Sequence, residues 1–280
     1  MEGRSSTGQA VVREVRRSGD SAVEGDAFTW LARAGLVARG VVYGVIGLLA
    51  LKVALGSGGK DTNQQGALQT IAQQPFGKLL LVAVALGLAG YAVWRLTMAA
   101  IGHGKRETSS GFDRLAAAGS GLVYGALCVT AVKILTGSSG SNSGAPKSAT
   151  AGVLGWTGGT EIVAIAGIVL VCVGVYQGYK GLARKFLDEA DTSRMGDGVK
   201  RAYTAAGLFG HVARAVVFAL VGYGLLAAGI DYEPRKAIGL DGALNELSRS
   251  SYGPVLLGVV AAGLIGFGLF SLADARYRRI

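Results

Sequence analysis

Basic residues inside apolar segments are the side chains of this sequence with the most evident chemistry. Arg39 and Arg214 each open a similar apolar run, "RGVVYGVIG" and "RAVVFALVG". Ionisable groups within membrane spans are costly and point to a functional site by default. At 1.5 Å per helical residue, both arginines lie roughly 9–10 Å from the centres of their expected spans. They could therefore also extend to the headgroups without forming any site.

A site for an anionic lipid headgroup is the sharper alternative. Arg33, Arg95 and Arg114 begin or end expected spans on the same side as Arg39 and Arg214. Cations crowded together repel one another unless an anion neutralises them, and arginine binds phosphate through two parallel hydrogen bonds. We therefore expect a lipid anion held by Arg39 and Arg214, with the other three arginines nearby.

The sequence gives little support for a catalytic or metal-binding site. His103 and His211 are far apart and lack companions with metal-ligand spacing, and Cys128 and Cys172 lie inside apolar runs. No Ser-His-Asp set or pair of carboxylates has a plausible arrangement. We expect no catalytic residue, no metal site and no cofactor, and hence a protein that is not an enzyme.

The elements that must position these arginines are membrane helices. Half of the 280 residues are hydrophobic, only 16% are charged, and 46 are glycine. Soluble domains usually carry about 25% charge. The composition predicts an all-α polytopic membrane protein. Six segments reach the roughly 20 residues that cross a bilayer, and they lie near 31–56, 76–100, 114–136, 159–183, 206–230 and 253–275.

The charge distribution predicts the orientation. Outside the expected spans or near their ends, 17 Lys and Arg residues fall on the side of the two termini and 6 on the other side. The positive-inside rule therefore places both termini in the cytoplasm, in a multi-pass membrane protein. Residues 1–29 lack the pattern of a signal peptide and are expected to form a cytoplasmic tail. The same asymmetry explains much of the net charge of +10, so no nucleic-acid partner is needed.

The chain also contains a threefold internal repeat. "SGLVYGALC" from Ser120 matches the runs that begin at Arg39 and Arg214, and "GALQTIAQQPFGKLLL" from Gly66 matches "GALNELSRSSYGPVLL" from Gly242. We expect two-helix repeats at 30–107, 112–187 and 203–280. Because each copy has two spans, all copies insert in the same direction, and a pseudo-threefold arrangement about the membrane normal is the natural closure.

Small residues recur in register in the first span of each repeat. Their small-xxx-small spacing gives a flat helix face that allows close backbone approach, which drives helix association in lipid. The strip consists of Gly40, Gly44, Gly47, Gly121, Gly125, Ala215, Ala219 and Gly222. We expect these residues to pack helices together and not to bind a ligand.

These patterns resemble a bacterial membrane-protein family known as domain of unknown function 1206, frequent in actinobacteria. The resemblance rests on "VVYG", "GAL", the aromatic-glycine turn before "LLL", and "GYAVWRL", over about residues 30–278. The second copy departs, with Ser120 in place of arginine and no turn like "PFG". The resemblance implies a six-span, three-repeat inner-membrane protein and supplies no activity or site residues.

The segments between the paired spans are expected to form short interfacial helices. In "GALQTIAQQ" the apolar Leu68 and Ile71 share a helical face, and in "GALNELSRS" Leu244 and Leu247 do so. Such helices could cap the bundle or dock a protein partner at the outer surface.

Two classes of function remain open. The absence of catalytic residues and the small size favour a non-enzymatic structural, sensing or accessory module. A small transporter or channel with a path or anion site along the pseudo-threefold axis is the alternative. The span centres near Ile46, Leu86, Gly125, Cys172 and Phe218 are apolar or small, which weakens the pore hypothesis.

Overall fold

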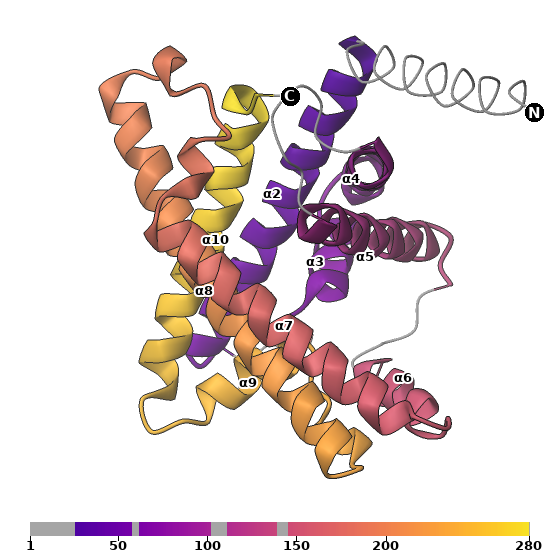
Figure 1. The fold of residues 1–280 in the computed structure, drawn as a ribbon. Helices are drawn as coiled ribbons and strands as arrows, with labels where there is room; N and C mark the ends of the chain where they lie inside the picture. Colours follow the sequence, from indigo (N-terminus) through magenta and orange to yellow (C-terminus); the bar gives the residue numbers. More distant parts are fainter. Residues whose placement is uncertain (1–25, 58–61, 102–110, 139–144, 280) are drawn as a thin grey trace, which may run out of the picture.

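The computed structural model describes residues 26–57, 62–101, 111–138 and 145–279 (Figure 1). Over these residues the fold is helical, with one isolated backbone bridge and no β-strand. The long helices are α2 (Asp26–Ala54), α4 (Gly77–Ile101), α5 (Gly111–Leu135), α7 (Gly159–Leu182), α8 (Asp197–Ile230) and α10 (Gly253–Tyr277). The short helices are α3 (Gln64–Ala72), α6 (Ala145–Leu154) and α9 (Leu240–Ser248).

The six long helices coincide with the six predicted spans, and all are long and apolar enough to cross a membrane. The main difference is at α8, which begins at Asp197 and not near residue 206. Its first turns are polar, with Lys200 and Arg201 exposed, and an acidic residue in the first turn favours a helix N-terminus. Hydropathy reports only the apolar part of such a helix. The expected tail 1–29 lies almost entirely outside the described residues.

Each repeat has the order long helix, short helix, long helix, and the second long helix starts at the same tight turn. Gly77, Gly159 and Gly253 begin α4, α7 and α10. A Cβ atom at any of them would lie 1.9–2.3 Å from a carbonyl oxygen at the end of the preceding short helix. Only glycine fits this approach, so the three glycines fix a common register for the second helices of the repeats.

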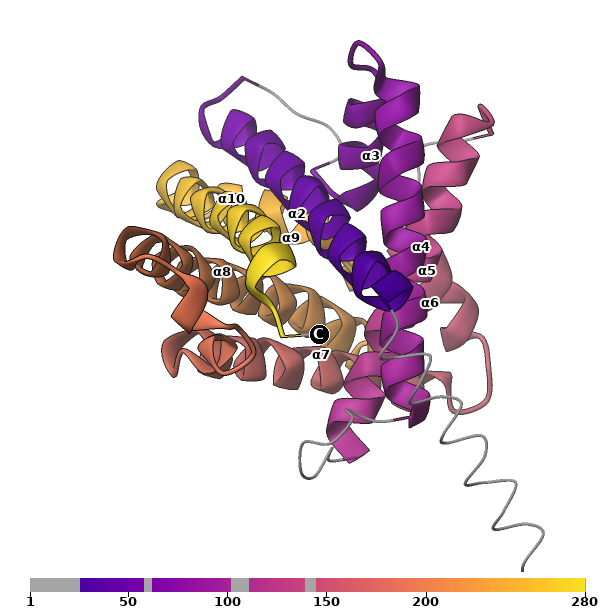
Figure 2. The ribbon, with the colours of Figure 1, turned by 90° about the horizontal axis from the view of Figure 1, so that it is seen from above.

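The closest helix pairs join different repeats. The second long helix of each repeat packs along the first long helix of the next, giving the pairs α4–α5, α7–α8 and α10–α2. The members of each pair lie side by side in both views (Figures 1 and 2). The α10–α2 pair connects the third repeat back to the first. The pattern of contacts between repeats is therefore cyclic.

Contacts within a repeat are present in two copies and missing in one. Helix α2 packs on α4 and α8 on α10, whereas α5 and α7 share no extensive contact in the described part of the chain. A Cβ atom added to Gly87 would lie 2.7 Å from Cβ of Ala38 in the first repeat. One added to Gly263 would lie 2.5 Å from Cβ of Ala213 in the third repeat. The equivalent residue of the second repeat is Val169, which is 50% exposed. A closed ring, as the sequence predicts, is thus interrupted between α5 and α7.

The small-residue strips face the second helix of the preceding repeat. A Cβ at Gly40 would lie 2.9 Å from the carbonyl oxygen of Gly268, and one at Gly222 would lie 2.9 Å from that of Gly167. Ala215 and Ala219 face Gly174 in the same way. Close backbone approach therefore holds each interface between repeats.

Two glycines of the strips are not tightly packed at their own Cβ positions. A Cβ at Gly44 would meet no atom within 4 Å, and one at Gly125 would meet only Ala92, at 3.9 Å. By contrast, a Cβ at Gly121 would lie 2.7 Å from Leu96. The sequence treats all members of the strip alike, whereas the tight positions in the first and second repeats are Gly40, Gly47 and Gly121.

The short helices bury their apolar faces inside the chain. Leu68 and Leu244 are buried, and α3 packs against α2, α4 and α5. Helix α9 packs against α8, α10 and α2. Each of these two helices therefore also touches the first long helix of the next repeat, which agrees with capping of the bundle, one of the two roles considered for them.

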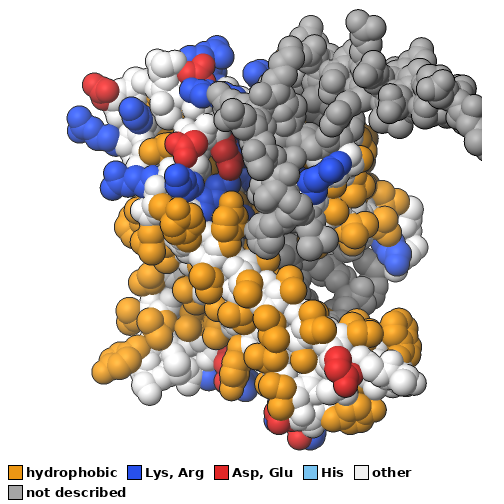
Figure 3. All heavy atoms as spheres, in the orientation of Figure 1, with side chains coloured by type: hydrophobic (Ala, Val, Ile, Leu, Met, Phe, Trp, Pro, Cys, Tyr) orange, Lys and Arg blue, Asp and Glu red, His pale blue; other side chains and the backbone are white. Residues whose placement is uncertain are grey.

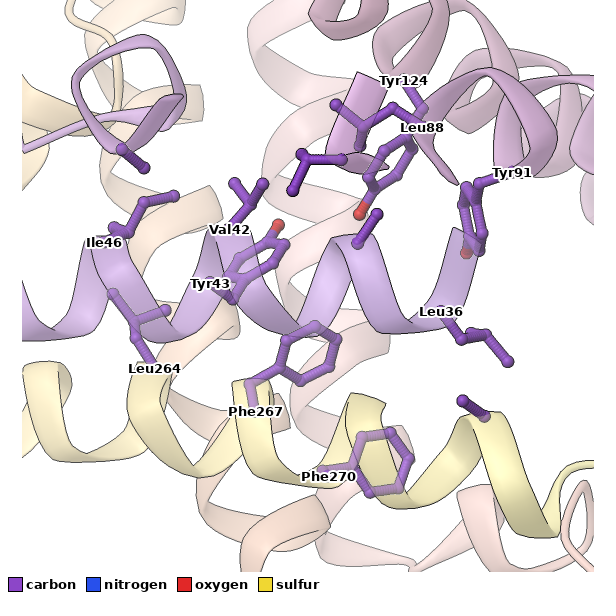
Figure 4. Packing of buried hydrophobic residues seen from close by; sticks show 14 of the residues in the cluster. Leu36, Val42, Tyr43, Ile46, Leu88, Tyr91, Tyr124, Leu264, Phe267 and Phe270 are labelled. Atoms are coloured by element: carbon purple, nitrogen blue, oxygen red, sulfur yellow. The ribbon is translucent and has the colours of Figure 1, made fainter. Parts of the chain in front are cut away.

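Aromatic side chains of the core also join neighbouring repeats (Figure 4). Tyr43 of α2 and Phe267 of α10 stack edge to face with centroids 4.8 Å apart, and Tyr124 of α5 and Tyr91 of α4 do so at 4.5 Å. Such pairs stabilise by about 0.5–1.5 kcal/mol beyond their burial. They lie at equivalent places in the α10–α2 and α4–α5 interfaces.

The glycine packing can be tested on one helix with one type of substitution. We expect Gly47→Ala to lower the Tm in detergent by several degrees, because the new methyl group would lie 2.7 Å from the backbone nitrogen of Ile265. Overpacking typically costs about 1–3 kcal/mol. Gly44→Ala, with open space at Cβ, should leave the Tm unchanged or raise it slightly. Equal losses in the two variants would contradict the role assigned to Gly47.

Candidate functional site

A polar contact involving one arginine occurs at each interface between repeats. Arg39 of α2 donates from Nε to Ser271 Oγ of α10 at 3.0 Å. Arg95 of α4 donates from Nε to Ser120 Oγ of α5. In the third interface, the amide oxygen of Gln177, with the side chain oriented to present it, accepts from both Nη atoms of Arg214 at 2.9 and 3.2 Å.

These three contacts occupy equivalent positions. Arg39, Ser120 and Arg214 align in the first helices, as the sequence repeat predicts. Arg95, Gln177 and Ser271 each lie 18 residues after the glycine that begins the second helix of their repeat. Ser120 stands where the other two repeats have arginine. In this interface the guanidinium group comes from Arg95 on the facing helix.

Arg39 is neutralised within the protein. Its Nη2 atom lies 3.5 Å from Oδ2 of Asp274, and its Nη1 donates to the hydroxyl of Tyr91 at 2.9 Å. Asp274 is fully buried and also accepts a hydrogen bond from Tyr203 at 3.0 Å. A buried charge requires such compensation. Arg39 therefore has a carboxylate partner within the protein, which removes the reason to expect a lipid anion as its counterion.

The ion-pair network continues to the C-terminal residues. Arg278 donates from Nη1 to Asp274 Oδ2 at 2.9 Å, and its Nη2 lies 2.7 Å from Oε2 of Glu189. Glu189 also pairs with Lys180 of α7. Backbone bonds join the same segments, because Asp191 donates to the carbonyl of Tyr277 at 2.7 Å. The network thus ties α2, α7, α8 and α10 together at one end of the molecule.

The environment of Glu189 holds its carboxylate in the charged form. Burial alone would raise the pKa, but the cations of Arg278 and Lys180 outweigh it and lower the pKa from 4.5 to about 2. Glu189 lies in the segment between α7 and α8, beyond the long apolar helices. Glu189 is therefore the member of the network whose ion pairs can be tested by a change of pH.

Arg214 has a different environment from Arg39. Its guanidinium carbon lies 4.4 Å from the ring centroid of Phe267, 5.1 Å from that of Phe218 and 5.2 Å from that of Tyr43. Its Nε atom is buried without a hydrogen-bond partner. Among the described residues, no carboxylate forms a salt bridge with it. Aromatic faces stabilise a cation but do not neutralise it.

Arg214 also lines a cavity of about 140 Å³. The walls are mostly apolar side chains of α2, α7, α8, α9 and α10, with Gln64 at the start of α3. The lining residues are Tyr43, Gln64, Leu170, Arg214, Val217, Phe218, Val221, Leu240 and Leu264. The cavity therefore combines one guanidinium group with an apolar enclosure.

The cavity lies where the repeated aromatic pair is incomplete. Tyr91 and Phe267 each stand 14 residues after the glycine that begins their helix, and the residue at that place in α7 is Val173. Phe218, the equivalent of Tyr43 and Tyr124, lines the cavity and has no ring partner among the described residues.

The structure brings only part of the predicted set together. Arg39, Arg95 and Arg214 belong to three different interfaces between repeats, but the guanidinium carbons of Arg39 and Arg214 lie 5.2 and 4.4 Å from the centroid of the same ring, that of Phe267. Arg114 is exposed and donates to the carbonyl oxygens of Ala99 and Ala100 at the end of α4. The Nε atom of Arg33 is buried and unpartnered among the described residues. Of the predicted set, only Arg214 faces the cavity.

The most important residue that the sequence interpretation missed is Asp274. It is an acidic residue within an expected apolar span, which is itself a signal for a functional or structural site. Glu189 and Tyr203 gave no such signal, because nothing in their local sequence indicates that they meet Asp274 and Arg278. Within the described residues, no cluster of His, Cys, Asp or Glu could hold a metal ion.

The pattern of repeats can be compared with known proteins. A model of the Domain of Unknown Function DUF1206 matches three times, at residues 34–102, 115–184 and 209–278. The chain belongs to this family. Each DUF1206 match contains one long–short–long helix unit.

A relative of similar length is also found. The Uncharacterized protein YxxB of Bacillus subtilis (strain 168) is 31% identical over 252 residues, which cover 89% of this chain and 90% of that protein. No solved structure matches the chain. The similarity thus extends over most of the length of both proteins, and neither description assigns an activity.

A double-mutant cycle can test whether Arg95 and Ser120 are an exchanged version of the pair formed by Arg39 and Ser271. We expect Arg95→Ser and Ser120→Arg each to lower the Tm, because the first removes the guanidinium group and the second brings two of them together. The double variant should recover most of the loss, since it reproduces the arrangement of Arg39 and Ser271. Additive losses in the double variant would show that the two positions are not equivalent.

The Glu189 ion pairs predict a pH-dependent stability. Because its pKa in the folded protein lies below the unfolded value of 4.5, the pairs stabilise the fold above about pH 4.5. This stabilisation is lost as the pH falls towards 2. The Tm of Glu189→Gln should therefore lie below that of the wild type at about pH 7, with a difference that shrinks below about pH 4. A difference independent of pH would contradict the ion pairing.

Proposed function

We propose that this protein is a non-enzymatic, multi-pass module of the bacterial inner membrane that binds an anionic lipid at Arg214. Both termini are placed in the cytoplasm, following the excess of Lys and Arg on that side. The proposal has two parts, insertion into the membrane and binding of the anion, and different observations support each.

Membrane insertion is supported by the distribution of exposed side chains. Hydrophobic residues cover the surface over α7 and α8, and charged residues gather towards the two ends of this face (Figure 3). The turns before the second helices carry exposed aromatic residues, with Phe76 83%, Trp156 65% and Tyr252 75% exposed. Aromatic residues at such positions are typical of membrane–water interfaces.

The contrast between Arg39 and Arg214 carries the assignment of the anion. Both are equivalent in the repeat, yet Arg39 has Asp274 as a counterion and Arg214 has only Gln177 and aromatic rings. A cation enclosed by apolar walls is costly unless an anion accompanies it. The unpartnered Nε atom of Arg214 offers a further donor to such a ligand.

A phosphate or carboxylate group fits this donor set. Guanidinium groups bind planar or tetrahedral oxyanions through paired N–H donors, and these charge-assisted bonds are about twice as strong as neutral ones. Anionic lipids supply such groups at high local concentration in the cytoplasmic leaflet. A lipid therefore satisfies the guanidinium and the apolar walls together.

A transporter of a small anion is the second candidate. It is favoured by the extent of the cavity, which is lined by Arg214 and also by Gln64 and Leu240 at the starts of the outer short helices. On this hypothesis free phosphate would occupy the cavity from the outer side. The two candidates differ in the source of the anion, which the experiment below separates.

The test is native mass spectrometry of the protein purified in mild detergent. We expect an anionic phospholipid to be retained by the wild type, to fall at least tenfold in Arg214→Gln, and to recover in part in Arg214→Lys. Arg201→Gln is the matched control, because Arg201 is an exposed arginine on the same helix. All variants are first compared by Tm to verify folding.

The outcomes discriminate between the candidates. Retention of lipid that is equal in Arg214→Gln and in the wild type would overturn lipid binding at this residue. Binding of added inorganic phosphate without retention of lipid, lost in Arg214→Gln, would favour the transporter of a small anion.

A further inference from the structure

Helix α7, which lines the cavity, does not pack closely against α5 over the described residues. In the first and third repeats this contact is closed by Gly87 and Gly263. In the second repeat, Gly119 of α5 stands at the place of Ala38 and Ala213, and a Cβ there would meet no atom within 4 Å. The two helices thus leave a gap, here called the α5–α7 seam.

The walls of the seam are apolar and uncovered. Val123 of α5 is 56% exposed, whereas the equivalent Val42 and Val217 are 1% and 6% exposed. Val169 of α7 is 50% exposed, and Cys172 is also exposed. Exposure at these positions is specific to the second repeat, because their counterparts in the other two are buried or partly buried.

The seam and the cavity share helix α7. Leu170 lines the cavity, and its neighbour Val169 lines the seam. Leu88 and Leu264, the equivalents of Leu170, are fully buried. Among the described residues, none of α4 or α5 contributes to the cavity lining. Helix α5 therefore does not line the cavity.

We propose that the α5–α7 seam is a lateral opening through which an acyl chain of the bilayer lies while its anionic headgroup binds Arg214. This inference rests on the proposed function and adds the route and the chain-bearing nature of the ligand. The occupant follows from complementarity. An acyl chain matches the apolar walls of the seam. A headgroup anion matches Arg214, the cation that lines the cavity, which has no carboxylate partner among the described residues.

A second protein helix is a poorer occupant. It would cover the seam through apolar contacts but would leave Arg214 without an anion, unless it carried an acidic residue at the right depth. A lipid supplies both parts in one molecule. In the first and third repeats, the glycine contact leaves no corresponding gap, so one such opening is expected per chain among the described helices.

The experiment measures ligands of increasing chain length in the whole protein. Inorganic phosphate, dihexanoyl phosphatidylglycerol and dioleoyl phosphatidylglycerol are titrated in detergent and followed by native mass spectrometry. The wild type should bind the dioleoyl lipid at least tenfold more tightly than the dihexanoyl lipid. Val169→Trp, which fills the seam, should remove this preference and leave the binding of phosphate unchanged.

Val175→Trp is the matched control. Val175 is 68% exposed on the same helix, and its counterparts Val93 and Leu269 are exposed in the other repeats. It therefore faces outward in every repeat and not into the seam. The control should bind all three ligands like the wild type, and the Tm of both tryptophan variants should be compared to verify folding.

The outcomes separate the two proposals. If Arg214→Gln weakens all three ligands but Val169→Trp behaves like Val175→Trp, the seam is not the route and the anion site stands. If Arg214→Gln changes none of them, the anion site fails and the inference about the seam fails with it. A dimer in the wild type that dissociates in Val169→Trp would assign the seam to a second copy and overturn the inference.

Discussion

Close backbone approach between the second helix of one repeat and the first helix of the next is the constraint on which the rest of the structure depends. Gly40 and Gly268 face each other across α2 and α10, and Gly167 and Gly222 do so across α7 and α8. Lipid offers no hydrophobic drive for association, so van der Waals contact at such positions must supply it. The repeats are consequently held together more by their neighbours than by their own helix pairs.

The buried guanidinium groups follow from this geometry. Each interface places one arginine beside a polar partner on the facing helix, and the partner differs among Ser271, Ser120 and Gln177. The other residues around each guanidinium group determine whether its charge is neutralised. Arg39 joins a buried network through Asp274, whereas Arg214 lies among aromatic rings beside a cavity. Divergence of the three copies has thus produced different environments at equivalent positions.

The sequence alone predicts the helices, the repeats and the equivalence of Arg39 and Arg214, because hydropathy and internal alignment report these directly. The exchange of Arg95 and Ser120 is not visible there, since it depends on which helix faces which across a repeat boundary. Asp274 carried a signal that the count of basic residues overlooked. The small-residue spacing marks the helix face that meets the neighbouring repeat, but local spacing does not tell Gly44, with open space at Cβ, from Gly47.

The interruption between α5 and α7 could not be predicted from local patterns, although it coincides with Val169 at the place where the other two repeats have glycine. Its consequence for binding is best tested by imaging the protein in lipid nanodiscs at a resolution that shows side chains and lipids. We predict an elongated density with its head beside the guanidinium group of Arg214 and its tail between α5 and α7. A closed α5–α7 contact, with Arg214 paired to a carboxylate of the protein, would contradict this account.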